Sequence, residues 1–102
     1  MSAPSSDRAG IRQAIRALKT DDWEVSSVWD GGEETFVKGE QEAIAAITAV
    51  DDARLYVVRR FGEREHGWVR FVLGNEPDEV MADWTVNLTA LDALLDRWIE
   101  VA

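Results

Sequence analysis

The sequence contains no cysteine, and this absence excludes several kinds of chemistry at once. The chain can form no disulfide and no thiolate nucleophile, and it cannot hold a cysteine-ligated zinc ion or an iron–sulfur cluster. A domain that folds without such bridges suits a reducing compartment. Residues 1–10 lack the apolar core of a signal peptide, and no apolar run approaches the roughly 18 residues of a membrane-spanning helix. We therefore expect a cytoplasmic protein that does not enter a membrane.

Residues that usually carry catalysis are equally scarce. The single histidine, His66, is expected in an exposed turn between two strands, where nothing would orient it as a base. Ser26 and Ser27 have no Gly-x-Ser-x-Gly motif around them, and Gly74 stands alone without a phosphate-binding loop. The sequence therefore favours a non-enzymatic protein with no catalytic residue and no cofactor.

Carboxylates are the only abundant chemistry, and four of them gather around one turn and the strand after it: Glu76, Asp78, Glu79 and Asp83. An EF-hand loop requires acids at alternate positions, a central glycine and a terminal glutamate, and this spacing is absent. We interpret the group as a solvated acidic turn, not a metal site. The same four residues are the first candidates for binding a partner.

Charge is sorted along the chain, which has a net charge of −9. The first twenty residues carry one acid against four bases, which leaves nineteen of the twenty acids and seven of the eleven bases in the remainder. Such sorting indicates a charged partner, or contact between two parts of the same molecule. The overall acidity argues against direct binding to nucleic acid or to anionic lipid, because both require a basic field.

Length and hydrophobic periodicity predict a single α+β domain over residues 7–102, preceded by a flexible leader over residues 1–6. Apolar residues recur at helical spacing over 8–19, 39–50 and 90–101. Alternation or β-branched and aromatic enrichment predicts strands at 23–29, 34–37, 54–61, 66–73 and 80–86. The order is α-β-β-α-β-β-β-α, which favours an antiparallel sheet with helices packed mainly on one face.

Five tryptophans are many for a chain of 102 residues. Simple alternation places Trp23 and Trp29 on the same face of their strand. Trp98 falls on the apolar face of the last helix, with Leu91, Leu94, Leu95 and Ile99. We expect at least three tryptophans in the core, where they fill a thin one-sheet domain. Whether one of them is instead an exposed anchor for a partner stays open.

Two charged stripes run along the first and last helices. Arg8, Arg12 and Arg16 are spaced by four residues and are followed by Lys19, so these bases are the second group of candidate binding residues. The acids of the last helix have the same spacing: Asp92, Asp96 and Glu100. If both helices cover one sheet face, the two stripes can meet within one molecule or across a dimer. Alternatively, each stripe is a solvated helix face.

Two functional hypotheses follow. The first is a small acidic interaction protein that binds a protein partner with a basic surface, as a bacterial or phage accessory or inhibitor protein would, including one that mimics nucleic acid. The second is a ligand-binding protein or enzyme with a pocket between sheet and helices, in which an acid acts with Tyr56, Arg59 or Arg70. If Arg70 faced the core it would require a buried carboxylate or an anion. Homodimerisation is compatible with both hypotheses.

Overall fold

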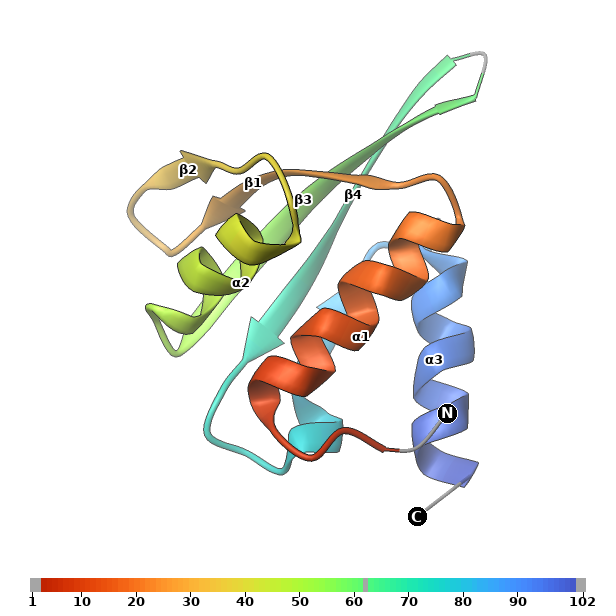
Figure 1. Cartoon of the computed structure of the whole chain (residues 1–102). Helices are drawn as coiled ribbons and strands as arrows, with labels where there is room; N and C mark the ends of the chain where they lie inside the picture. Colours follow the sequence, from red (N-terminus) through yellow and green to blue (C-terminus); the bar gives the residue numbers. More distant parts are fainter. Residues whose placement is uncertain (1–2, 62, 101–102) are drawn as a thin grey trace.

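Five strands and three α-helices follow one another along residues 3–61 and 63–100, the part of the chain that the computed structural model describes (Figure 1). Their order confirms the predicted α+β fold. One short 3-10 helix, η1, precedes the last strand. The bounds are α1 Asp7–Thr20, β1 Glu24–Trp29, β2 Glu34–Phe36, α2 Glu40–Thr48, β3 Asp52–Phe61, β4 Glu63–Val72, η1 Pro77–Glu79, β5 Met81–Trp84 and α3 Thr89–Glu100.

The strands form one antiparallel sheet in the order β2-β1-β3-β4-β5, with β3 at its centre. The β3–β4 hairpin is the longest pairing, and its end extends beyond the helices as an arm (Figure 1). Pairing continues as far as Phe61 opposite Glu63. His66 therefore lies within β4, opposite Val58, and the prediction that it sits in the turn is wrong. Strand pairing extends through residues that look like a polar turn in the sequence. The predicted turn residue 62 lies outside the described residues.

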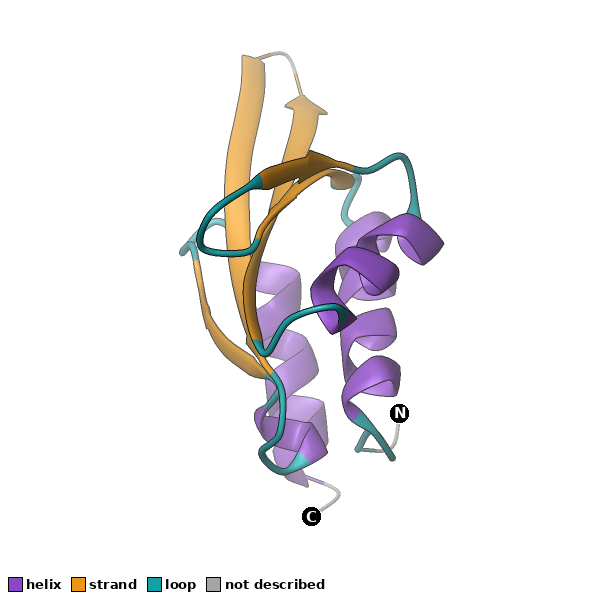
Figure 2. Cartoon of the chain, turned by 90° about the vertical axis from the view of Figure 1, so that its left-hand side faces the viewer, coloured by secondary structure: helices purple, strands orange, loops and turns teal. Residues whose placement is uncertain are grey.

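All three helices cover the same face of the sheet, as predicted (Figure 2). The residues of β3 and β4 that point toward the helices are fully buried: Ala53, Leu55, Val57, Val69 and Phe71. From the helices, Ile11, Ala14, Ile15 and Leu18 of α1 and Leu91, Leu94 and Trp98 of α3 complete the core. We call the opposite side of the sheet the outer face. In the described part of the chain, no helix packs on it.

Helix α1 begins and packs as its sequence predicts. The Ser6 hydroxyl accepts a hydrogen bond from the Ala9 amide at 3.1 Å and so caps the helix. The Trp98 indole N–H donates to the Gln13 side chain at 2.7 Å, which joins α1 to α3. Pro4 is buried, so the described part of the predicted leader already contacts the domain, whereas residues 1–2 lie outside the described residues.

Strand β1 contains a bulge that overturns one prediction. Val25 is opposite Val57 and Ser27 is opposite Tyr56, so Ser26 is an extra residue in β1. The bulge reverses the alternation within the strand. As a result Trp23 lies in the core at 1% exposure, whereas Trp29 is 38% exposed on the outer face. The two tryptophans therefore do not share a face.

Two other expectations, the burial of Ile99 and the placement of at least three tryptophans in the core, differ from the structure. Ile99 is 61% exposed although it was expected on the apolar face of the last helix. Only Trp23 and Trp98 are fully buried tryptophans, and Trp68 and Trp84 are half-buried. Helix α3 turns only one side toward the sheet, so Ile99 projects past the covered area.

Candidate functional site

The outer face carries two rows of side chains that cross the strands. The aromatic row runs through Phe36 in β2, Ser27 in β1, Tyr56 in β3 and Trp68 in β4, each directly opposite the next. Phe36 is 75% exposed. Directly opposed side chains in an antiparallel sheet lie about 5 Å apart and contact each other. The strand register thus collects aromatic residues from distant parts of the sequence on one surface.

The second row, which we call the charged row, lies beside the first and crosses all five strands. Its members, in order from β2 to β5, are Glu34, Trp29, Arg54, Arg70 and Asp83. The two ends of the row are acidic and its centre is cationic and aromatic. Trp29 and Phe36 together provide the most exposed aromatic surface of the outer face.

The arginines of the outer face are held in place by neighbours. The Arg54 guanidinium lies 4.6 Å from the centre of the Trp68 ring. Arg70 donates two hydrogen bonds to the Asp52 carboxylate, at 2.9 and 2.6 Å. The hydrogen bond from Arg70 lowers the pKa of Asp52 below its ordinary value, and the same contact raises the pKa of Arg70. Arg70 is therefore a paired surface charge on the outer face and does not face the core.

A shallow hollow of about 480 Å³ lies at one end of the outer face. Trp29 and Arg54 line it together with Asp30 and the Asp52–Arg70 pair. Asp30 Oδ1 accepts hydrogen bonds from the Glu33 and Gly32 amides at 2.7 and 2.9 Å, which lower the pKa of Asp30. The hollow therefore combines an exposed indole with a carboxylate that stays ionised.

The four acids singled out from the sequence do not all belong to this surface. Asp83 is the β5 end of the charged row, opposite Arg70. The turn that holds the other three is tied to the start of α1, because Asp7 Oδ2 accepts a hydrogen bond from the Gly74 amide at 3.1 Å. Those three lie in and beside η1: Glu76, Asp78 and Glu79.

The basic stripe of α1 faces α2, not α3. Arg16 donates to the Glu40 carboxylate at 2.9 and 3.2 Å, and Arg12 lies 3.9 Å from it. Arg8 reaches the Thr48 hydroxyl at 3.5 Å. Among the described ion pairs, none joins α1 to the acids of α3, so of the alternatives left open by the sequence, a meeting of the two stripes within one molecule is not observed. Helix α2 occupies the side of α1 on which the bases project.

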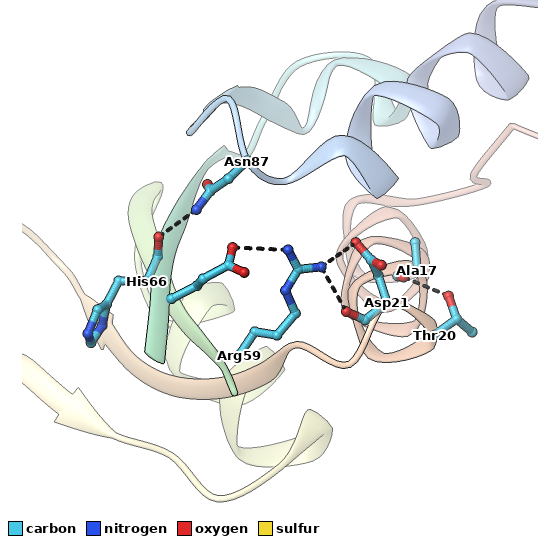
Figure 3. A network of polar contacts seen from close by, with 7 residues as sticks. Ala17, Thr20, Asp21, Arg59, His66 and Asn87 are labelled. Atoms are coloured by element: carbon cyan, nitrogen blue, oxygen red, sulfur yellow. Dashed lines mark hydrogen bonds and ion pairs between the residues drawn. The ribbon is translucent and has the colours of Figure 1, made fainter. Parts of the chain in front are cut away.

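Arg59 lies at the centre of a network of polar contacts (Figure 3). Its guanidinium contacts Asp21 Oδ2 at 3.1 Å and Glu65 Oε2 at 3.0 Å, and it lies 4.5 Å from the centre of the Trp23 ring. His66 contributes only its backbone carbonyl here, which accepts from the Asn87 amide at 2.8 Å (Figure 3). Arg59, Tyr56 and Arg70 thus lie in three different environments, and the structure does not bring them together as one pocket.

The sequence prediction missed Phe36 and Trp29 as exposed aromatics of the outer face. A partial signal was present for β2, because a short predicted strand, residues 34–37, is typical of a sheet edge. The bulge at Ser26 had no comparable signal.

Comparisons with protein-family models, with curated proteins and with solved structures found no match to this chain. Within residues 3–61 and 63–100, no three histidine or acidic side chains are grouped so that they could hold a metal ion. In the same part of the chain, no helix is both long enough and apolar enough to cross a membrane.

Proposed function

We propose that this protein is a small non-enzymatic interaction module whose outer face binds a protein partner with a basic surface. The observation that supports this most directly is the uncovered sheet face with its aromatic row. A monomeric protein rarely leaves adjoining large aromatics in water without a use for them. Tryptophan and tyrosine are also the residues that most often dominate the energy of protein interfaces.

The outer face combines the kinds of side chain that are enriched at protein interfaces, aromatic residues and arginine. Phe36 lies on the edge strand β2, and Trp29 and Tyr56 lie on the next two strands, so the aromatic side chains occupy the β2 side and the centre of the outer face. Arg54 and Arg70 lie on the central strand β3 and on β4. The aromatic side chains would supply most of the affinity, and the charged row would supply selectivity.

Charge complementarity favours a basic partner. Both ends of the charged row are acidic, at Glu34 and Asp83, and the neighbouring turn adds Asp30 and Glu33. Arg70 is already neutralised by Asp52. With a net charge of −9, the whole molecule would also attract a basic protein during diffusional encounter and would repel a second copy of itself.

A non-enzymatic role agrees with the side chains that are present. His66 is exposed on the outer face, and among the described residues its imidazole has no hydrogen-bond partner. A catalytic histidine normally requires a neighbour that orients it and a nucleophile within reach. An accessory or inhibitor protein of a bacterium or phage would need only the surface described above.

The proposal can be tested by passing a lysate of the source cells over the immobilised protein at low salt and eluting with a salt gradient. The expected result is one stoichiometric basic protein that is no longer retained by the Trp29→Ser/Phe36→Ser variant. The matched control is Val86→Ser/Ile99→Ser, which removes two exposed apolar residues outside the outer face and should retain the partner.

A second pair of variants separates local from overall charge. Glu34→Lys/Asp83→Lys reverses the two ends of the charged row, whereas Glu42→Lys/Glu100→Lys makes the same change in net charge on exposed helix positions. The first variant should release the partner at clearly lower salt than the second. Retention lost only on reversing Glu76, Asp78 and Glu79 would overturn docking on the outer face.

Self-association is the remaining outcome. Light scattering after size exclusion should show a monomer. A dimer that disappears in Trp29→Ser/Phe36→Ser would mean that a second copy covers the outer face, and it would contradict the basic partner. Failure of every variant to change retention would contradict the proposal as well.

A further inference from the structure

A second hollow lies on the opposite side of the sheet, between α1, α2 and the start of β1. Its volume is about 300 Å³, at the small end of the range for ligand pockets. Half of its lining residues are apolar, namely Ile15, Leu18, Trp23, Val25 and Val57, and of these only Val25 is partly exposed. The outer face contributes none of these side chains, so this inference does not depend on the proposed function.

Two lysines and two glutamates lie at the mouth of this pocket. Lys19 and Lys38 line it, and both are exposed and form no ion pair with a described residue. Glu40 also lines it, but its carboxylate is bound by Arg16, which is the main cause of its lowered pKa. Glu24 is the other acid at the mouth. The two lysines are therefore the charges available to a ligand.

Two further groups of hydrogen-bond donors belong to residues that line the pocket. Helix α2 begins here, and its N-cap Gly39 provides no side chain to bond the free amides of the first turn. Such amides and the helix dipole favour an anion. Trp23 is 1% exposed, and its indole N–H has no acceptor among the described residues. A buried donor without a partner is costly, and an acceptor brought by a ligand would remove that cost.

We propose that this pocket binds a small organic anion that carries a carboxylate on a short apolar body. The carboxylate lies between Lys19, Lys38 and the first turn of α2. The apolar body packs on Val25 and on the aliphatic parts of the two lysines, and an oxygen of the ligand accepts from the Trp23 indole. Neither part of the ligand is sufficient alone, because exposed lysines bind a bare anion weakly and the apolar wall is small.

The test is titration of the ¹⁵N-labelled full chain with octanoate, followed by NMR. Inorganic phosphate serves as an anion without an apolar body, and 1-octanol serves as an apolar body without an anion. Octanoate should shift the amides of Gly39 and Val57 and bind at least about tenfold more tightly than either of the other probes. Equal responses to octanoate and 1-octanol, or octanoate shifts confined to other parts of the molecule, would overturn the proposal.

Substitutions then test which side chains donate hydrogen bonds to the ligand. Lys19→Ala/Lys38→Ala should weaken octanoate binding by about tenfold or more, because charged donors contribute more than neutral ones. Arg60→Ala/Arg64→Ala removes two cations from the hairpin arm and should bind octanoate like the wild type. Trp23→Phe should weaken binding as well, and circular dichroism should confirm that it folds. Unchanged affinity in the lysine variant would contradict the proposed site.

The two proposals can fail separately. Trp29→Ser/Phe36→Ser, which should abolish partner binding, should leave octanoate binding unchanged because both residues lie on the outer face. Lys19→Ala/Lys38→Ala should conversely retain the protein partner. Loss of both activities in either variant would mean that the two surfaces are coupled, and it would overturn the independent anion site.

Discussion

The two faces of the sheet are built from alternate residues of the same strands and yet hold opposite kinds of side chain. In β3, Leu55 and Val57 are buried under the helices, whereas Arg54, which precedes Leu55, projects into solvent and Tyr56 between them is half-buried. In β4, Phe71 is buried and the preceding Arg70 is exposed. The helix-covered face therefore contributes most of the stability, whereas residues on the outer face can differ without disturbing the core.

The two faces contribute unequally to the free energy of folding. Burying a large apolar side chain stabilises a fold by about 1.5–3 kcal/mol, so the covered face accounts for most of the favourable free energy. Exposed aromatics such as Phe36 lose little hydration on folding, so they contribute little to the free energy of folding. A substitution on the outer face should consequently change binding without changing the fold.

The sharpest comparison is between two phenylalanines, one on each face. Phe71→Ala should lower the free energy of unfolding by about 3–5 kcal/mol, because it leaves a cavity in the core. Phe36→Ala should change it by no more than about 0.5 kcal/mol, since this side chain is 75% exposed. Urea unfolding with fitted midpoint and slope measures both. A large loss in Phe36→Ala would mean that the outer face also holds the fold together.

A substitution at Gly67 should lower stability by a smaller amount than Phe71→Ala. It tests the packing in the opposite way, because a side chain is added instead of removed. A Cβ at Gly67 would lie 2.8 Å from Leu88 Cδ2 and 2.9 Å from Thr85 Oγ1, both closer than normal contact. Leu88 is itself fully buried and has little room to move. Gly67→Ala should therefore destabilise the protein by about 1–3 kcal/mol.

The control for this substitution is Gly32→Ala in the β1–β2 turn. Its nearest neighbour would be Asp30 Oδ1 at an ordinary 3.7 Å, so its stability should stay close to that of the wild type. Equal thermal midpoints for the two variants would show that the covered face is less tightly packed than the structure indicates.

The smallest expected effect concerns the Asp52–Arg70 pair on the outer face. Arg70 lowers the pKa of Asp52, so this carboxylate contributes stability above its ordinary pKa and loses it as the pH falls through the folded-state pKa. Arg70→Gln should return the pKa of Asp52 toward 3.8, measured by NMR titration of the carboxyl group.

The stability difference between wild type and Arg70→Gln should be small at neutral pH, because the pair is solvated, and should vanish in acid. A large difference at neutral pH, or one that persists when Asp52 is protonated, would contradict the view that polar contacts on the outer face contribute little to folding.

Much of the fold could be predicted because it depends on local pattern. The apolar positions of α1 recur at helical spacing, and Ser6 is a good N-cap, so the helix and its buried side could both be recognised. The candidate site was harder to predict from the sequence. Its aromatic row takes Phe36, Tyr56 and Trp68 from three strands, and only the register brings them together.

The sequence by itself determined the elements, their order and the acidity of the molecule, because helical and strand periodicity are properties of neighbouring residues. Only the tertiary structure decided that the bulge at Ser26 separates Trp23 from Trp29, and that the bases of α1 meet Glu40 of α2. Both outcomes depend on how segments far apart in the chain pack. Strand register and helix placement are set by the combined burial of many side chains, which no short stretch of sequence contains.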